Sequence, residues 1–167
     1  YERPQTADIY LTIDALGQYY TESILNKYAE RYKVKHAFAL VQDSQTGFIL
    51  AAASYPSKDG LSLPFQFTYE PGSTFKTITV GAALDTGSIK MKDKIGMENN
   101  KWSVSSIIIK DHQEQPSLTI SEIMEVSSNI GAAKISFDLG AKTMYSYIKK
   151  FGFGVKSNVN FLGEPAG

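Results

Sequence analysis

A serine and a lysine three residues apart, Ser73 and Lys76, form the pair whose types and spacing best suit nucleophilic chemistry. They follow Pro71-Gly72, a dipeptide that can mark the start of a helix. Residues three apart on a helix share a face, so the lysine amine could take the proton of the serine hydroxyl. A helix start also presents free backbone N–H groups, which could stabilise a developing oxyanion.

The Ser-x-x-Lys spacing is weak evidence when taken alone. With 17 serines and 15 lysines in 167 residues, chance yields about 1.5 such pairs, and a second copy indeed begins at Ser146. No glycine or proline precedes that copy, which falls inside a predicted helix, where a serine hydroxyl bonds back to the helix or to water. For Ser73, helix capping is the competing interpretation.

A triplet downstream, Ser127-Ser128-Asn129, is the Ser-x-Asn sequence of the chain. It lies between two predicted helices, where side chains can point into a cleft. Capping of the second helix by Asn129 is the competing interpretation. Combined with Ser73 and Lys76, the triplet predicts a proton-passing hydroxyl at Ser127 and a substrate-orienting amide at Asn129.

Hydrophobic spacing and capping residues predict the elements that must position these groups. An early amphipathic helix should begin after Asp14, with its regularly spaced tyrosines packed in the core or at its rim. A hairpin should follow, and then a mostly helical remainder with the serine opening a buried central helix that ends at Gly87. The predicted helices are 15–31, 73–85, 119–125, 129–139 and 142–150, and the predicted strands are 37–42, 48–54 and 104–109, with a loop over 55–64.

Composition excludes several classes of function. Lys plus Arg (17) balances Asp plus Glu (17), so a nucleic-acid footprint is not expected. The absence of cysteine excludes disulfides and thiolate metal sites, and His36 and His112 lack ligand spacing, so we expect no metal or cofactor. No apolar run reaches the length of a membrane span. Lys134 is expected to be a solvated or structural charge, and both chain ends are interpreted as cuts inside a longer protein.

Several motifs in order resemble one family, the class B penicillin-binding proteins, and most closely their division-specific, septal type. The matching stretches are Leu11-Thr12-Ile13-Asp14 with Gln18, Val41–Ala51, Tyr55-Pro56-Ser57, Tyr69–Lys76, Ser127–Lys134 and Phe151–Gly154, leading to Gly163-Glu164. The resemblance implies an α+β fold of the penicillin-binding and serine β-lactamase type, an antiparallel sheet with a helical subdomain. Residues 1–167 would be the N-terminal part of that transpeptidase domain.

The resemblance also implies the chemistry. Ser73 would be the acylated nucleophile of a D,D-transpeptidase that cross-links peptidoglycan stem peptides and is trapped by β-lactam antibiotics. Lys76 would be the base, Ser127 the hydroxyl that passes a proton to the leaving amine, and Asn129 a ligand of the substrate amide. The intact protein would work with cell-division proteins at the extracytoplasmic face of the membrane, anchored by an N-terminal segment outside this sequence.

The family's third motif, Lys-Thr-Gly, does not occur; Asp85-Thr86-Gly87 lacks the lysine. In the family this motif supplies a cation and the strand that provides the second oxyanion donor. Bringing the pKa of a lysine from about 10.4 to about 7 takes roughly 4–5 kcal/mol, and a helix terminus provides at most about 2 kcal/mol. A missing oxyanion donor typically lowers the rate about 100- to 1000-fold. We therefore expect that the 167 residues alone are not a competent transpeptidase, and that open sheet edges favour aggregation.

Two other functions compete with this interpretation. A serine β-lactamase would need a base that activates water for deacylation, and the late acid Glu164 lacks the surrounding pattern of the class A enzymes. A non-catalytic sensor or structural module could retain the fold alone, but it would have no need for Ser73, Lys76, Ser127 and Asn129 together.

Overall fold

The computed structural model describes residues 8–57, 62–157, 159 and 161–167. The chain forms two compact units. The first comprises Tyr1–Thr68 with Asn158–Pro165, and the second comprises Tyr69–Ser157 with Ala166–Gly167.

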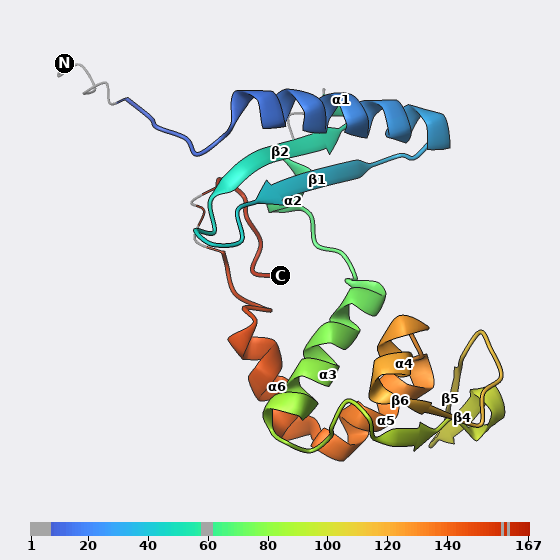
Figure 1. Ribbon diagram of the computed structural model, residues 1–167. Coiled ribbons are helices and arrows are strands. Elements are labelled where there is room, and N and C mark those ends of the chain that lie inside the picture. Colours follow the sequence, from blue (N-terminus) through green and yellow to red (C-terminus); the bar gives the residue numbers. More distant parts are fainter. Residues whose placement is uncertain (1–7, 58–61, 158, 160) are drawn as a thin grey trace. The chain divides into compact units, whose positions relative to one another are not determined.

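The first unit is built from a long helix and a hairpin (Figure 1). Helix α1, Ala15–Tyr32, begins where the Asp14 carboxylate accepts the N–H of Gly17 at 2.6 Å, which satisfies one free donor of the first turn. The Gln18 side chain joins the helix to the hairpin, because its amide both donates to the Ala52 carbonyl and accepts the Ala52 N–H, each at 2.8 Å. The N-cap predicted at Asp14 is confirmed.

The hairpin pairs β1, Ala37–Gln42, with β2, Ile49–Tyr55, in antiparallel register and with an irregularity at Val41/Gln42. Its loop is ordered by Asp43, whose carboxylate accepts the N–H groups of Thr46 and Gln45 and the Thr46 hydroxyl. These hydrogen bonds to the charged form lower the pKa of Asp43.

A short helix, α2, Leu63–Gln66, falls partly inside the segment predicted as loop. It holds the returning chain, since Gln66 Nε2 donates to the Leu162 carbonyl at 3.0 Å and Phe65 stacks on Phe161 at 4.8 Å between ring centroids. Four residues are too few for a helical period to show in the sequence.

The tyrosine face predicted to pack along α1 is exposed instead. Tyr20 and Tyr28 are 55% and 43% exposed, and Leu16, Ile24 and Tyr32 are exposed as well. The helix contacts the hairpin mainly through β2, and Ala29 is its one buried residue.

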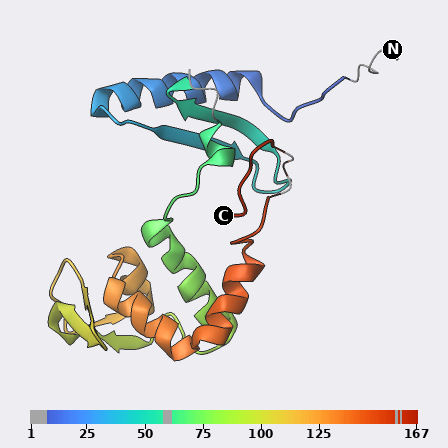
Figure 2. The same cartoon turned by 180° about the vertical axis from the view of Figure 1, so that it is seen from behind.

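The second unit holds the central helix and the remaining helices and short strands (Figures 1 and 2). A 3₁₀ turn, η2, Gly72–Phe75, leads into α3, Lys76–Asp85, which packs against α5 and α6. The other elements are β3 (Lys94–Gly96), η3 (Glu98–Asn100), β4 (Lys101–Val104), β5 (Ile107–Lys110), β6 (Ser117–Thr119), α4 (Ile120–Glu125), α5 (Asn129–Leu139) and α6 (Ala141–Lys150).

The core of this unit is aliphatic. Its buried side chains include Ile78, Val80, Met97, Leu118, Ile120, Ile123, Ile130, Ile135, Leu139 and Met144. Helix α3 buries five consecutive or near-consecutive positions, as expected for a central helix. The local stop and start signals are also confirmed: Thr119 and Glu122 form a capping box, and Gly140 ends α5.

The single strand predicted over Val104–Ile109 is wrong. These residues belong to a hairpin, in which β4 and β5 pair antiparallel and the chain turns at Ser105 with a φ of 52°. A serine, unlike glycine, gives no strong sequence signal for a left-handed residue. The antiparallel pair of β3 and β6 is only three residues long on each side, too short for an alternating pattern.

Candidate active site

The Ser73 hydroxyl and the Lys76 amine lie together at the start of α3. Lys76 Nζ is 3.2 Å from Ser73 Oγ, within hydrogen-bonding distance. Ser73 sits in the 3₁₀ turn that precedes the α-helix, and Gly72 before it has a φ of 59°, a conformation that glycine adopts at no steric cost. The serine is exposed whereas Lys76 is half-buried, so an accessible hydroxyl stands beside a partly sheltered amine.

The second polar group predicted from the sequence converges on the same amine. Lys76 Nζ contacts the Ser127 carbonyl at 2.5 Å, Ser127 Oγ at 2.9 Å and Asn129 Oδ1 at 2.8 Å. Together with Ser73, the amine therefore has four oxygen neighbours. Two of these neighbours, the Ser127 carbonyl and Asn129 Oδ1, can only accept hydrogen bonds, whereas the Ser73 and Ser127 hydroxyls can also donate to the lone pair of a neutral amine. The amine is therefore within reach of a serine proton.

The electrostatics of Lys76 point the same way. Burial lowers the pKa of Lys76 because it removes the charged form from water, and the nearby Asp111 carboxylate partly opposes this by favouring the cation. The net direction is downward. A lowered lysine pKa increases the fraction of neutral amine that can act as a base.

Ser127 is held in an unusual backbone conformation between α4 and α5. Its φ is 56°, in the left-handed region that costs a residue with a Cβ of the order of 1–3 kcal/mol. In this conformation both its carbonyl and its hydroxyl reach Lys76. The strain is thus found at the residue that joins the two parts of the site.

Ser128, not Asn129, caps helix α5. The Ser128 hydroxyl accepts the N–H of Gly131 at 2.8 Å. The capping alternative considered for Asn129 is therefore wrong, because the middle residue of the triplet performs that role. This leaves the Asn129 amide free to bond Lys76 through its oxygen and the Lys110 carbonyl, at 3.1 Å, through its nitrogen.

Asp111 is the residue of the site that the sequence did not reveal. Its carboxylate accepts the Ser128 hydroxyl at 2.5 Å, the N–H of Asn129 at 2.6 Å and the N–H of Ile130 at 3.2 Å. An anion at the positive end of α5 is favourably placed. Because Asp111 directly follows β5, the end of the β4–β5 hairpin holds the triplet in position. An aspartate after a strand is common in turns, so only an alignment of relatives could have drawn attention to it.

Two other features noted in the sequence, Lys134 and the second Ser-x-x-Lys pair, take no part in the hydrogen bonds that the described residues form with Lys76. Lys134 donates to the Gly96 carbonyl and to Glu98, both at 2.8 Å, which ties α5 to the β3–η3 segment in a structural role. Ser146 is exposed on α6, and Lys149 donates to the Phe153 carbonyl at 3.2 Å, so the second Ser-x-x-Lys resembles no catalytic pair.

Neither a metal site nor a membrane span is found in the described part of the chain. Among residues 8–57, 62–157, 159 and 161–167, no three His, Asp or Glu side chains cluster closely enough to hold an ion. Within the same residues, no helix combines the length and apolarity needed to cross a bilayer.

Comparison with known families decides which proteins this chain is related to. The family model described as the penicillin binding protein transpeptidase domain matches residues 37–167. The chain belongs to this family. Its fold is accordingly the α+β transpeptidase fold expected from the sequence.

Relatives and solved structures of this family agree over nearly the whole chain. A probable peptidoglycan D,D-transpeptidase, PenA, of Neisseria gonorrhoeae is 32% identical across 96% of the chain, and the stage V sporulation protein D of Bacillus subtilis is 30% identical across 96%. The transpeptidase domain of penicillin-binding protein 3 from Burkholderia pseudomallei superimposes with a TM-score of 0.88 at 31% identity over 94% of the chain.

The chain spans only part of these proteins. It covers 29% of the length of the Neisseria protein, 27% of the Bacillus protein and 46% of the solved Burkholderia chain. A peptidoglycan D,D-transpeptidase, FtsI, of Buchnera aphidicola is also related, with 28% identity over 96% of the chain and 30% of the relative.

Proposed function

We propose that the protein containing this chain is a peptidoglycan D,D-transpeptidase that works by serine acyl transfer in septal cell-wall synthesis. The observation that carries the proposal is the convergence of Ser73, Ser127 and Asn129 on one amine, with every contact to Lys76 Nζ at 3.2 Å or less. Chance can place a Ser-x-x-Lys pair in a sequence, but it does not bring a Ser-x-Asn triplet to it from 51 residues away.

The reaction follows from these positions. The neutral amine of Lys76 takes the proton of Ser73 as its Oγ attacks the carbonyl of the donor stem peptide. When the tetrahedral intermediate collapses, the departing amine gains a proton through the Ser127 hydroxyl, which is 2.9 Å from Lys76 Nζ. The resulting ester on Ser73 is then attacked by the amine of a second stem peptide, which forms the cross-link and frees the serine.

Asn129 is proposed to orient the donor peptide. Its side-chain amide lies beside Lys76 and can form hydrogen bonds with a substrate backbone, while its backbone N–H donates to the Asp111 carboxylate. β-Lactams would acylate the same serine, because their strained amide presents a carbonyl to the same nucleophile. No cofactor or metal has a part in this chemistry.

The cellular context belongs to the proposal as well. Names such as FtsI and stage V sporulation protein D among the relatives favour a role in septum formation beside cell-division proteins. The stem peptides lie outside the cytoplasmic membrane, so the active domain is proposed to face the extracytoplasmic side, held there by an N-terminal anchor.

The decisive experiment compares two serines of the full-length protein. Intact-mass spectrometry after exposure to benzylpenicillin should show one covalent adduct in the wild type and in Ser146→Ala, and none in Ser73→Ala. The Ser146 variant is a matched control because it removes the same hydroxyl from the other Ser-x-x-Lys pair. An adduct that persists in Ser73→Ala would falsify the assignment of the nucleophile.

Two related measurements separate the competing functions. An adduct that survives for hours identifies a transpeptidase, whereas one hydrolysed within seconds identifies a β-lactamase. Normal septation in cells that carry only Ser73→Ala would favour a non-catalytic module. A polypeptide limited to residues 1–167 should not be labelled, because the Lys-Thr-Gly motif is not in its sequence; strong labelling would contradict that expectation.

A further inference from the structure

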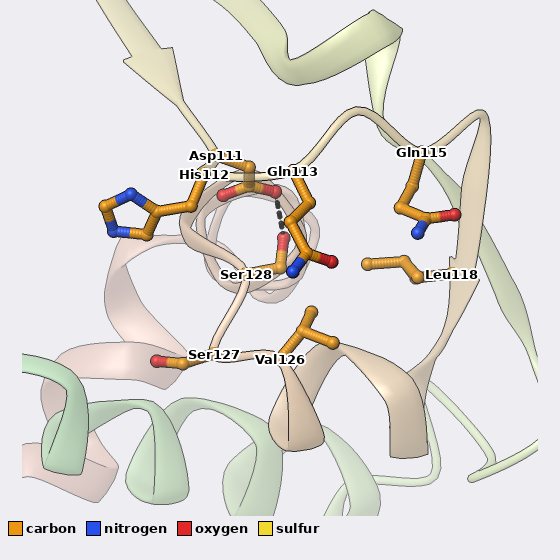
Figure 3. Close-up of a pocket in the computed structure, with 8 residues that line it drawn as sticks. All are labelled: Asp111, His112, Gln113, Gln115, Leu118, Val126, Ser127 and Ser128. Atoms are coloured by element: carbon orange, nitrogen blue, oxygen red, sulfur yellow. Dashed lines mark hydrogen bonds between the residues drawn. The ribbon is translucent and has the colours of Figure 1, made fainter.

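A small cavity lies directly behind the Ser-x-Asn triplet, and the chemistry proposed above makes no use of it. It has a volume of about 160 Å³ and lies between the loop that follows β5 and the junction of α4 with α5 (Figure 3). Leu118 and Val126 point into it from two sides, and the amide side chains of Gln113 and Gln115 border it. The Ser127 hydroxyl, in contrast, points away from the middle of the cavity.

The size of the cavity limits what can enter it. An apolar cavity of about 150 Å³ accommodates one benzene ring. The cavity behind the triplet is therefore large enough for a single ring with a small substituent, and too small for a drug-sized ligand, which needs about 300 Å³ or more.

The lining determines the chemical class of the ligand. Leu118 is buried and, with Val126, offers an aliphatic surface on which a ring can pack. Gln113 and Gln115 each carry an amide that can both donate and accept, which suits a neutral polar substituent. The Asp111 carboxylate also borders the cavity, and its negative charge disfavours an anion there. His112 lines the cavity as well, but its ring points away from the middle (Figure 3).

The cavity shares its wall with the active site. Ser127 and Ser128 line it, and the same Ser127 contacts Lys76 through its carbonyl and hydroxyl. Ser127 holds its left-handed conformation against an unfavourable backbone energy. A ligand that fits the cavity as described favours this conformation over any in which Ser127 has moved, since a ligand stabilises the state that it binds.

We propose that this cavity is a binding site for small, neutral, single-ring compounds with one amide-like substituent, and that its occupancy stabilises the Lys76–Ser127 arrangement. The coupling to acylation rests on the function proposed above. Binding itself does not, and it can be tested separately.

Binding is tested on the full-length protein with benzamide and benzoate, which share a ring and differ in charge. Ligand-observed NMR should show benzamide binding with a Kd of about 1–10 mM, as expected for so small a ligand, and benzoate binding at least about tenfold more weakly. Val126→Phe should fill the cavity and abolish benzamide binding. Val34→Phe, the same exchange at a position in the other unit, should leave it unchanged.

A second variant guards against loss of fold in Val126→Phe. Gln113→Ala shortens an exposed side chain at the border of the cavity and should weaken benzamide binding several-fold in a protein with unchanged circular dichroism. Benzamide binding that is absent in the wild type, that persists in both cavity variants, or that benzoate matches overturns the proposed site.

Coupling is tested by the rate of acylation with a fluorescent penicillin. Saturating benzamide should accelerate acylation about twofold or more in the wild type and in Val34→Phe, and not in Val126→Phe. An unchanged or lower wild-type rate overturns the coupling. A wild type that is never acylated refutes the transpeptidase proposal instead, and leaves the NMR result to decide the binding site.

Discussion

The carboxylate of Asp111 has two effects on the site that substitutions can separate. It holds the start of α5 through hydrogen bonds from Ser128 Oγ and from the N–H groups of Asn129 and Ile130. It also acts on Lys76, where its negative charge opposes the lowering of the pKa by burial. Asp111→Ala removes both effects, whereas Asp111→Asn removes the charge and keeps an oxygen that can accept the Asn129 N–H.

The cost of Asp111→Ala to stability follows from the lost contacts. A hydrogen bond to a charged group contributes about 1.5–3 kcal/mol, and an anion at a helix N-terminus about 0.3–1 kcal/mol. Since Asp111 is only half-buried, water replaces part of the loss. We expect a decrease of about 2–4 kcal/mol in the free energy of unfolding, measured by urea denaturation of the full-length protein.

Acylation rates of the two variants separate the positioning role of Asp111 from the effect of its charge. With the triplet no longer held, Asp111→Ala should lower the acylation rate about 10- to 100-fold, since small misplacements of reacting groups have effects of this size. Asp111→Asn should stay within about tenfold of the wild type. Removing the negative charge makes the Lys76 cation less favourable and so lowers the pKa of Lys76 further. The acid limb of the pH–rate profile of Asp111→Asn should therefore move to lower pH.

The assay is the second-order rate of labelling by a fluorescent penicillin across pH, with Glu114→Gln as control. Glu114 is an exposed carboxylate in the same loop, so its neutralisation should change neither stability nor the acid limb. An acylation rate of Asp111→Ala equal to that of the wild type would show that the carboxylate does not position the triplet. Movement of the Asp111→Asn acid limb to higher pH would contradict the electrostatic argument.

Three further outcomes are expected for residues of the second unit. Burial lowers the pKa of Lys76, so the folded state disfavours its charged form. The acylation rate and the free energy of unfolding should therefore both rise with pH as Lys76 loses its proton, and the pH–rate profile should have its inflection below the pKa of an ordinary lysine. An inflection at or above that ordinary pKa refutes the prediction. Gly131→Ala should lower the free energy of unfolding by about 1–3 kcal/mol, because the added Cβ would lie 2.6 Å from Ile123 atoms. The matched helical change Gly81→Ala places its Cβ with no atom within 4 Å, so it should be neutral or stabilising by up to about 1 kcal/mol in thermal unfolding. Lys134→Met should cost about 1–2 kcal/mol through loss of its two hydrogen bonds and its ion pair, while a large fall in acylation rate would show that it does more than support the fold.

The sequence predicted most of the helices because their signals are local. Asp14 begins α1, the Thr119–Glu122 capping box begins α4 and Gly140 ends α5, and each of these signals acts within one helical turn of its residue. The same locality explains the errors. A turn at Ser105 and a four-residue helix at Leu63–Gln66 leave no periodic pattern in the sequence.

The sequence also determined the chemical types at the site, but not their arrangement. Ser73 and Lys76 are neighbours in any helix, so their pairing could be predicted from spacing alone. The approach of Ser127 and Asn129 to Lys76 spans 51 and 53 residues and depends on the packing of α3 against α5. Spacing along the chain carries no information about such contacts.

Asp111 shows most clearly what only the tertiary structure decided. It lies 17 to 19 residues before its partners, and it reaches them only because the β4–β5 hairpin ends beside the start of α5. The helix cap formed by Ser128 and the contacts of the Asn129 amide likewise depend on distances set by the fold, and the lowered pKa of Lys76 depends on its burial. The sequence thus supplied a nucleophile, a base and an amide, and tertiary packing made them one site, because hydrogen bonds and desolvation depend on distance in space.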